Sequence, residues 1–556
     1  MKVLLICTIL FTNIMFAAFP APKKSKNGMV TSSNAIATKI GTEVLENGGN
    51  AFDAAVAVGY ALAVVHPSAG NLGGGGFAVI RTKDGQSYAL DFRESAPSKA
   101  TRDMYLDGNK QPIKDLSIIG YLAAGVPGSV AGLNALNERF GSKSLHELID
   151  SSIKLAQNGF PITPRQEQTM LSAKDDFAKF ESSRKYFLKP DGTTYKEGEM
   201  LVQQDLAKTL RAIQKDGTKA FYEGEIADLI AKDMQKNGGI ITKQDLKNYQ
   251  VKWREPISGT YHGYNIISMP PPSSGGVHIL EILNIMENAP IKDLGVNSSK
   301  SIHIMAEAMR QAYVDRTHYL GDPDFIRVPT SKLIDKNYAK KIYENIKDKV
   351  IPSSKIKTGG LEIYESPQTT HYSIVDKEGN AIAITYTLNG SYGSGAAVNG
   401  AGFLLNNEMD DFSIKPGVPN LYGLIGSSAN EIAPNKRPLS SMSPTIVTKD
   451  NELFMVVGSP GGARIITTVL QVISNVIDHG MNLQEAVLFP RFHMQYLPDE
   501  IRYEKFGLSN DTIEALQNMG YIMAQKAPMG DVNAILVERK NDGVIFYGAE
   551  DTRREF

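Results

Sequence analysis

The last third of the chain contains two strand–turn–strand patterns, and they restrict the possible folds more than any other feature. The segments "TTHYSIVD" and "NAIAITYTL" alternate their side chains as strands do, and "KEGN" between them supplies Gly379 for a tight turn. The segment "PTIVTKDNELFMVVGSP" predicts a second hairpin. Because hairpins join antiparallel neighbours, we expect antiparallel strands rather than a doubly wound parallel sheet.

Helical patterns fill much of the remaining sequence. "NAIATKIGTEVLENGGN" predicts a helix that ends at its Asn-Gly-Gly, and "AFDAAVAVGYALAVV" predicts a helix buried on most sides. Residues 100–350 look largely helical, and "GARIITTVLQVISNVIDHG" is an amphipathic helix directly after the second hairpin. Helices combined with antiparallel strands predict a layered α+β sandwich.

Length and charge exclude some classes of protein. The chain has 556 residues, which is long for one ordinary domain, and its apolar content of 42% is enough for a large core. Lysine and arginine number 59 against 60 aspartates and glutamates, so the net charge is -1. This balance gives no support for nucleic-acid binding, which normally shows a basic excess.

The N-terminus is typical of an exported protein. Met1-Lys2 precedes a short apolar run, and small residues follow at Ala18 and Ala21. We therefore expect residues 1–21 to be a cleaved signal peptide and the mature protein to be periplasmic or secreted. The lysines of "KKSK" just beyond the apolar run argue against export. If the run were an uncleaved anchor, their positive charges would favour keeping the following chain inside the cell. The only cysteine, Cys7, lies in this segment, so the mature protein would have no disulfide and no thiol nucleophile.

Motifs of several familiar enzyme classes are absent from the sequence. It contains no HExxH, no GxSxG and no Walker loop, and "NLGGGGF" lacks the Lys-Ser/Thr expected of a phosphate site. The glycine run therefore predicts a tight backbone turn, and His371 is expected to pack on a strand face. In "VVGSPGGAR", Gly461 and Gly462 precede a helix, whose N-terminal N–H groups favour developing negative charge. We interpret them as an oxyanion hole, with a glycine-containing helix cap as the alternative.

Two further regions offer groups that bind charged ligands. "LLNNEMDDF" places Glu408, Asp410 and Asp411 together after a strand, and such a cluster can hold an ammonium group. Arg93 in "LDFRESAP" and the hydroxyls of "RPLSSMSP" suit a carboxylate, because both kinds of group donate hydrogen bonds to it. The hydroxyls belong to Ser440, Ser441 and Ser443. Taken alone, each region is also consistent with a surface or capping role.

Long, ordered segments resemble the γ-glutamyltranspeptidase family essentially from end to end. They are "VVHPSAGNLGGGGF", "LDFRESAPSKATRDMYLD", "MPPPSSGG", "LGDPDF", "QTTHYSIVDKEGNA", "GFLLNNEMDDFS", "NKRPLSSMSPTIV" and "GSPGGARIITTVLQ". The resemblance implies an α+β N-terminal nucleophile hydrolase with an αββα sandwich. It also implies a precursor that cuts its own Gln368–Thr369 bond. The products would be a large subunit, residues 22–368, and a small catalytic subunit, residues 369–556, which form a heterodimer.

Such a cleavage accounts for the threonine at position 369. A threonine hydroxyl is a poor nucleophile until a base removes its proton, and a freed α-amine with a pKa of about 7.7–8.0 can be that base. An internal threonine has no α-amine, so cutting the chain creates the catalyst. Thr370 points to the opposite face of the strand and cannot share this role.

The resemblance also implies roles for particular residues. Thr369 would be the nucleophile for self-cleavage and for γ-glutamyl transfer, with Thr387 assisting it and with Gly461 and Gly462 as the oxyanion hole. The groups expected to hold the substrate α-carboxylate are Arg93, Ser440 and Ser441. The groups expected to hold its α-amino group are Asn389, Glu408 and Asp411, and Tyr422 would cover the bound glutamyl group.

The implied substrates are glutathione, glutamine and other γ-glutamyl compounds, and the γ-glutamyl ester would pass to water or to acceptor amino acids or peptides. No metal or organic cofactor is implied. One alternative is a related amidase, either cephalosporin acylase-like or polyglutamate-cleaving, which Arg93 and the serines disfavour. A second is an uncleaved, inactive binding protein, which the intact Thr369 and Thr387 disfavour. A third, a conventional Ser/His/Asp hydrolase, lacks its nucleophile motif.

Overall fold

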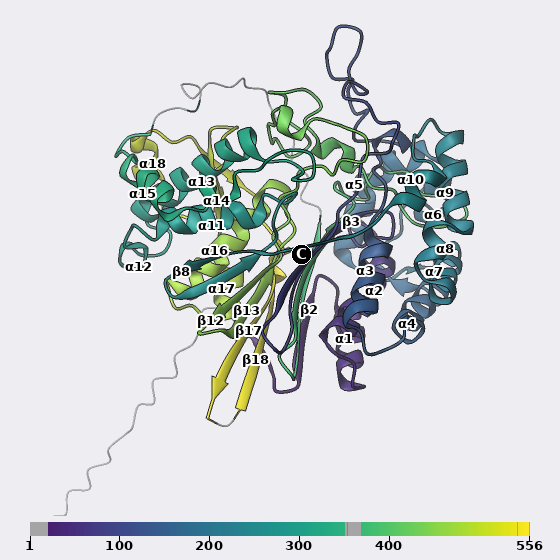
Figure 1. Ribbon diagram of the computed structural model, residues 1–556, viewed down its shortest axis with the longest axis horizontal. Coiled ribbons are helices and arrows are strands. Elements are labelled where there is room, and N and C mark those ends of the chain that lie inside the picture. The colour runs from purple at the N-terminus through teal and green to yellow at the C-terminus, as the bar shows by residue number, and fades with distance from the viewer. Residues whose placement is uncertain (1–19, 351–352, 354–368, 542, 555–556) are drawn as a thin grey trace, which may run out of the picture.

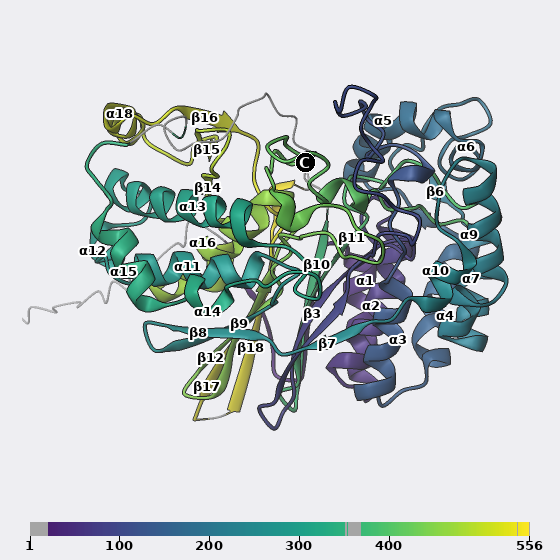
Figure 2. The same ribbon diagram turned by 45° about the horizontal axis from the view of Figure 1, so that its top comes forward.

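Two antiparallel sheets stack face to face at the centre of the molecule, and helices cover both outer faces (Figure 1). The computed structural model describes residues 20–350, 353, 369–541 and 543–554. The helices that precede residue 250 lie on one side of the sheets and the later helices lie on the other side, which a second view confirms (Figure 2). This is the αββα sandwich predicted from the sequence.

The first sheet has six strands in the order β2-β10-β11-β3-β4-β7. Their bounds are β2 (Gly28–Ser32), β10 (Thr370–Asp376), β11 (Ala381–Thr387), β3 (Gly75–Arg81), β4 (Ser87–Phe92) and β7 (Lys252–Arg254). Helices α1 to α10 lie on its outer side. They are α1 (Ala35–Glu46), α2 (Ala51–Val65), α3 (Ser129–Phe140), α4 (Leu145–Asn158), α5 (Pro164–Lys179), α6 (Glu181–Phe187), α7 (Gln204–Asp216), α8 (Thr218–Tyr222), α9 (Glu225–Lys236) and α10 (Lys243–Asn248).

The second sheet has seven strands in the order β1-β18-β17-β13-β12-β9-β8. Their bounds are β1 (Lys23–Ser25), β18 (Gly543–Glu550), β17 (Asn533–Lys540), β13 (Glu452–Gly458), β12 (Thr445–Lys449), β9 (Tyr264–Ser268) and β8 (Ile257–Tyr261). The helices on this side are α11 (Gly275–Met286), α12 (Ile291–Leu294), α13 (Ser299–Tyr319), α14 (Thr330–Leu333), α15 (Lys336–Glu344), α16 (Ile465–Ile477), α17 (Leu483–Leu488) and α18 (Asn510–Met519).

Two small sheets lie outside the sandwich. One joins β14 (Phe492–His493), β15 (Ile501–Glu504) and β16 (Met523–Lys526), and the other joins β5 (Phe160–Pro161) and β6 (Met200–Leu201).

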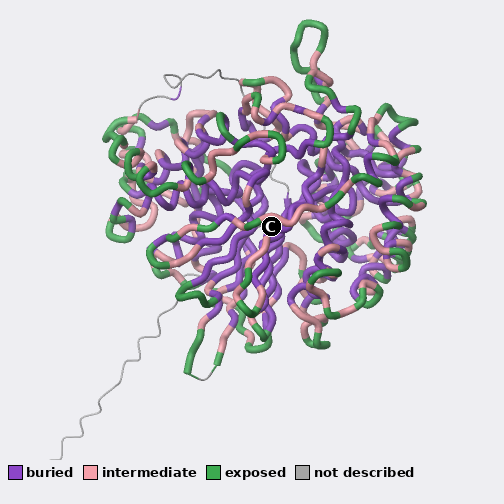
Figure 3. Tube along the Cα trace, in the orientation of Figure 1, coloured by how far each residue is buried: buried purple, intermediate pink, exposed green. Residues whose placement is uncertain are grey.

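Both predicted hairpins form, but their strands are more deeply buried than simple alternation suggests. Strands β10 and β11 pair antiparallel around the turn at Gly379, whose φ is 96°. Every residue of both strands is buried, because one face of the sheet meets α2 and the other meets the second sheet. The buried parts of the chain trace both sheets and the helices next to them (Figure 3). Thus the sandwich removes the exposed face that an isolated hairpin would have.

Local sequence signals account for the first two helices. The Asn34 side chain accepts a hydrogen bond from the Ile36 N–H at 2.9 Å and begins α1, and Gly48 follows its end with a φ of 80°. Asn50 and Asp53 form a capping box at the start of α2, and every residue of that helix is buried. Both helical predictions are confirmed.

The prediction for residues 100–350 missed the two-residue strands β5 and β6 and three strands of the main sheets, β7, β8 and β9. Strands β8 and β9 are joined by a tight turn at His262 and Gly263, which have φ values of 47° and 82°. Glycine favours such a turn, but a histidine at positive φ is uncommon, so the sequence signal is weak. The three strands matter because β7 completes one sheet, while β8 and β9 extend the other.

The predicted signal peptide lies almost entirely outside the described residues. Immediately beyond it, β1 pairs antiparallel with β18 at the edge of the seven-stranded sheet. A chain that began after residue 21 would therefore keep this strand. No helix in the described part of the chain is long and apolar enough to cross a membrane.

His371 is fully buried between the two sheets, as its assignment to a strand face predicted. Ser373 donates its hydroxyl hydrogen to the Asn533 carbonyl at 3.1 Å, so its oxygen accepts from His371 Nε2 at 3.0 Å. His371 Nδ1 then accepts from the Thr385 hydroxyl at 2.8 Å. Burial lowers the pKa of His371 to about 3. The ring is therefore neutral and structural at neutral pH.

We expect the buried His371 to make the protein acid-labile. The pKa of His371 is lower in the folded protein than in the unfolded chain, so on acidification the unfolded chain takes up the proton first. The free energy of unfolding therefore decreases as pH falls from about 6.5 toward 3. Replacing His371 with Gln should reduce the loss of unfolding free energy between pH 7 and pH 5.5 by about 1.3 kcal/mol, measured by urea unfolding. His146→Gln, the same substitution at an exposed histidine, is the matched control. Parallel pH profiles for His371→Gln and wild type would contradict the assignment.

Candidate active site

The predicted site residues meet at one end of the two sheets, where β10 begins and β11 ends; we term this the nucleophile end. A cavity of about 20 Å³ lies there, which is room for roughly one water molecule. Its lining contains every residue to which the family resemblance gave a catalytic or substrate-binding role except Gly461, which directly precedes the lining residue Gly462. Those residues are Arg93, Thr369, Thr387, Asn389, Glu408, Asp411, Tyr422, Ser440, Ser441 and Gly462. The further candidates Asp410 and Ser443 do not line it.

The pairing of β10 with β11 positions Thr369. Thr370 is opposite Tyr386 in the ladder, so by continuation Thr369 comes beside Thr387. The Thr369 hydroxyl donates to Thr387 Oγ1 at 3.4 Å, and Thr387 Oγ1 also accepts from the Asn389 N–H at 2.8 Å. Thr370 instead donates to Ser33 Oγ at 3.2 Å, which confirms that the side chains of the two adjacent threonines have different neighbours. Gln368, the other residue of the predicted cleavage site, lies outside the described residues.

Arg93 is bound to the acidic residues of the site. Its side chain is fully buried, Nη1 pairs with Glu408, and Nη2 pairs with Asp411 Oδ2 at 2.6 Å. Burial raises the pKa of Glu408 above its usual range, although Arg93 opposes this shift. The groups expected to hold a carboxylate and the groups expected to hold an ammonium therefore neutralise each other across the cavity. This follows from the cost of leaving a buried charge without a partner.

The acidic cluster predicted from "NEMDDF" divides into two parts. Glu408 and Asp411 line the cavity, whereas Asp410 accepts hydrogen bonds from the Ser117 hydroxyl at 2.7 Å and from the Leu421 N–H at 2.7 Å. Burial raises the pKa of Asp410 to about 6. Asp410 thus anchors the loop that carries Tyr422 and is not part of the cavity wall.

Sequence analysis missed Glu94, which directly follows Arg93. Its carboxylate is fully buried and lies 3.6 Å from Arg93 Nη1. Burial raises the pKa of Glu94 to about 7, although the charge of Arg93 opposes this shift. The available signal was the "RES" triplet, which sets a second charge beside Arg93 at the end of a buried strand.

A second buried arginine was also missed. Arg316, on α13, donates from Nε to Ser274 Oγ at 3.1 Å and from Nη2 to Ser441 Oγ at 3.4 Å. Ser274 in turn donates its hydroxyl to the Ser440 carbonyl at 2.8 Å. Arg316 therefore braces both predicted carboxylate-binding serines from behind. The signal was a charge on the core-facing side of a long helix.

The glycines predicted as an oxyanion hole stand at the start of a helix. Gly461 has a φ of 142° and Gly462 has a φ of 56°, and a short 3₁₀ turn, Gly462–Arg464, leads into α16. The Tyr422 ring packs on Gly462, since a Cβ there would lie 2.4 Å from Tyr422 Cδ1. The Tyr422 hydroxyl donates to the Asn389 carbonyl at 2.5 Å. Tyr422 therefore closes the cavity over Gly462.

The layered sheets and the threonine directly before the buried strand β10 define an N-terminal nucleophile hydrolase. The fold matches a solved cephalosporin acylase from Bacillus halodurans with a TM-score of 0.86, 27% identity and 98% coverage of both chains. The sequence profile described as Gamma-glutamyltranspeptidase matches residues 37–556. The chain belongs to the γ-glutamyltranspeptidase family.

Similar proteins include two kinds of enzyme precursor. A glutathione hydrolase proenzyme from Escherichia coli is 53% identical over 534 residues, covering 96% of this chain and 91% of the relative. An Acylase ACY 1 proenzyme from Pseudomonas sp. is 38% identical over 482 residues, covering 86% and 84%. A solved γ-glutamyltranspeptidase chain from Helicobacter pylori is 58% identical with a TM-score of 0.60, covering 60% of this chain and 96% of that one.

The contact between Tyr422 and Gly462 leads to a prediction about stability. Gly462→Ala would force a methyl group against the Tyr422 ring and would also strain a positive φ. Gly480→Ala is the matched control, because Gly480 has a φ of 64° and a methyl group added there would have no heavy atom within 4 Å. We expect Gly462→Ala to lower the free energy of unfolding by about 1–3 kcal/mol more than Gly480→Ala does, measured by urea unfolding. Equal losses would mean that Tyr422 does not pack on Gly462.

Proposed function

We propose that this protein is a self-processing γ-glutamyltransferase and glutathione hydrolase. The observation that carries the proposal is the arrangement of one cavity, with the Thr369 hydroxyl on one wall and groups for both charges of an amino acid on the others. The glutathione hydrolase proenzymes among its relatives support the same activity. The substrate class is then a γ-glutamyl amide, such as glutathione or glutamine.

Substrate binding exchanges one set of ion pairs for another. In the closed cavity Arg93 pairs with Glu408 and Asp411. The substrate α-carboxylate would take Arg93, together with Ser440 and Ser441, and its α-ammonium would take the two acids and the Asn389 amide. Because the substrate brings one charge of each sign, the buried network keeps its net charge. A ligand with only one of these charges would leave a buried group unpaired, which is costly.

Maturation would cut the Gln368–Thr369 bond and free the Thr369 α-amine. Residues 22–368 and 369–556 would remain together because, in each sheet, strands of the second piece pair on both sides with strands of the first. In the six-stranded sheet β10 pairs with β2, and β11 pairs with β3. In the seven-stranded sheet β12 pairs with β9, and β18 pairs with β1. The heterodimer is therefore held by main-chain hydrogen bonds and by the shared core.

The reaction would proceed through an ester. The Thr369 hydroxyl proton passes to the α-amine, Oγ1 bonds to the γ-carbonyl carbon, and the C–N bond breaks as the proton moves to the leaving amine. Backbone N–H groups at Gly461 and Gly462 would stabilise the negative charge on the carbonyl oxygen. Water then releases glutamate, or an amino acid or peptide takes the γ-glutamyl group. We place this activity in the periplasm or outside the cell, after removal of residues 1–21.

A related acylase activity is the second candidate. The Pseudomonas acylase precursor and the Bacillus cephalosporin acylase structure favour it, because both share the fold and much of the chain. Arg93 and the serines favour the γ-glutamyl activity, since they suit a substrate with a free α-carboxylate. The two activities differ in their need for a free α-amino group, and this difference can be measured.

The first test concerns self-cleavage. We expect purified wild-type protein to give two bands on a denaturing gel, with the smaller band beginning at Thr369 by N-terminal sequencing. Thr369→Ala should remain one chain, because the attacking hydroxyl is absent. Thr370→Ala is the matched control and should still be cut, since its hydroxyl faces Ser33. Cleavage of Thr369→Ala at the same bond would overturn the self-processing proposal.

The second test concerns the substrate ammonium. N-acetylation of γ-glutamyl-p-nitroanilide keeps the scissile amide but removes the charge that Glu408 and Asp411 would pair with. We expect a loss of kcat/KM of about a hundredfold or more on the mature enzyme, roughly 2.7 kcal/mol. Comparable turnover of both compounds would remove the ammonium site from these residues and would favour the acylase activity.

A further inference from the structure

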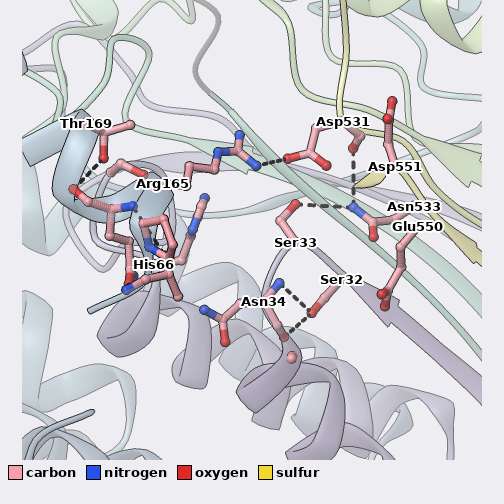
Figure 4. Close-up of a pocket in the computed structure, with 15 residues that line it drawn as sticks. Ser32, Ser33, Asn34, His66, Arg165, Thr169, Asp531, Asn533, Glu550 and Asp551 are labelled. Carbon is pink, nitrogen blue, oxygen red and sulfur yellow. Dashed lines mark hydrogen bonds and ion pairs between the residues drawn. The ribbon is translucent and has the colours of Figure 1, made fainter. Parts of the chain in front are cut away.

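A second pocket lies at the nucleophile end, on the far side of Thr369 from the cavity already described. Its volume is about 360 Å³, and it is open to solvent. It is formed where β2 leads into α1, where α5 begins, and at the ends of β17 and β18 (Figure 4). We term it the outer pocket. The residues used below are Ser33, Ala35, Arg165, Asp531, Asn533 and Glu550.

Strand order places Thr369 between the two pockets. In the six-stranded sheet β10 lies between β2, which leads to Ser33 in the outer pocket, and β11, which ends at Thr387 in the inner cavity. The other sheet shows the same order, because β17 and β18 lead to the outer pocket while β13 and β12 lead to the inner one. Thr370 contacts Ser33 directly, so the outer pocket begins one residue from the nucleophile.

The outer pocket holds a buried acceptor at the end nearest Thr369. Asn533 is 1% exposed, and its Nδ2 donates to Ser33 Oγ at 3.2 Å and to the His371 carbonyl at 3.1 Å. These contacts fix the amide, and its Oδ1 has no hydrogen-bond partner within the described residues. Figure 4 shows the amide between Ser33 and Glu550. A buried oxygen of this kind is stabilised by an incoming N–H donor.

Arg165 supplies the positive charge of the outer pocket. It pairs with Asp531 at 2.7 Å, and its side chain is 25% exposed. A guanidinium carries five N–H donors in a planar fork, so it can hold Asp531 and a second carboxylate together. Burial, together with the nearby Arg165, lowers the pKa of His66 to about 4, so this neighbouring ring adds no charge at neutral pH. The pocket therefore offers an oxygen acceptor near Thr369 and a carboxylate-binding group farther out.

We propose that the outer pocket binds the amine partner of the transfer reaction, a free amino acid or short peptide. Its amine would lie at Asn533, near Thr369, and its carboxylate at Arg165. This inference rests on the proposed γ-glutamyl transfer and adds the location of its second substrate. By microscopic reversibility, the peptide half released from a γ-glutamyl peptide leaves through the same pocket.

The transfer step balances with groups already present. The neutral amine nitrogen bonds to the ester carbonyl carbon, and one of its hydrogens passes to the Thr369 α-amine. The bond from that carbon to Thr369 Oγ1 then breaks, and the same proton returns to Oγ1. The products are a new γ-glutamyl amide and the free Thr369 hydroxyl. Hydrogen bonding of the other amine hydrogen to Asn533 Oδ1 would leave the nitrogen lone pair directed at the ester.

The test uses the mature wild-type enzyme with γ-glutamyl-p-nitroanilide as donor and glycylglycine as acceptor. Arg165→Gln should raise the KM for glycylglycine by a factor at least about ten times larger than any increase in the donor KM measured for hydrolysis. This is the effect expected from losing one charge-assisted hydrogen bond. With glycylglycine amide, which lacks the carboxylate, wild type and Arg165→Gln should have similar acceptor KM values. Arg184→Gln, an exposed arginine outside the pocket, is the matched control.

A second variant covers the case in which Arg165→Gln fails to fold or mature. Ala35 is exposed at the start of α1 and lines the outer pocket, so Ala35→Trp should fill it without disturbing the core. This variant should raise the KM of both glycylglycine and its amide. Unchanged acceptor KM in the variants, or hydrolysis without transfer in wild type, would overturn the inference and leave the hydrolase proposal standing. Absence of p-nitroaniline release from wild type would instead overturn the proposed function.

Discussion

The antiparallel pairing of β10 with its two neighbours is the constraint on which the rest of the site depends. This strand is buried along its whole length and is paired with β2 on one edge and with β11 on the other. Its register sets Thr369 beside Thr387, and strand alternation turns Thr370 toward Ser33. A slip of one residue would exchange the two threonines and would move His371 out of its contacts between the sheets. The same hydrogen bonds thus fix the fold and the position of Thr369, the proposed nucleophile.

Charge is the second constraint, because charged side chains from different elements meet in the walls of the inner cavity. Arg93 follows β4, while Glu408 and Asp411 lie on the 3₁₀ turn that spans Glu408–Asp411. These groups are too deeply buried to remain unpaired, so in the closed cavity they pair with one another. A substrate with an α-carboxylate and an α-ammonium can replace each partner with a like charge. The cavity therefore favours an amino-acid head group over a ligand with a single charge.

The two proposed subunits share their sheets, which connects processing with stability. In both sheets the strands that follow Thr369 form a central block with earlier strands on either side, so neither piece contains a complete sheet. The chain would therefore fold as a single precursor before the proposed cut. The nucleophile end also gathers its groups from widely separated parts of the sequence, among them Arg93 and Ser440. This explains why a cut beside the nucleophile need not disperse the site.

The sequence by itself determined many of the local elements and named the residues proposed to react. Hairpin turns, helix caps and apolar periodicity predicted the layered sandwich, and the ordered motifs named the residues that line the inner cavity. Sequence reasoning did not find β7, β8 and β9, because they are short and a histidine occupies the turn between β8 and β9. It also did not separate Asp410 from its acidic neighbours or find Glu94 and Arg316. Nor did it show that Arg93 pairs with Glu408, or that an outer pocket lies beyond Thr369. The Arg93–Glu408 pair and the outer pocket join residues hundreds of positions apart, and only the stacking and register of the two sheets decide which buried charges become neighbours.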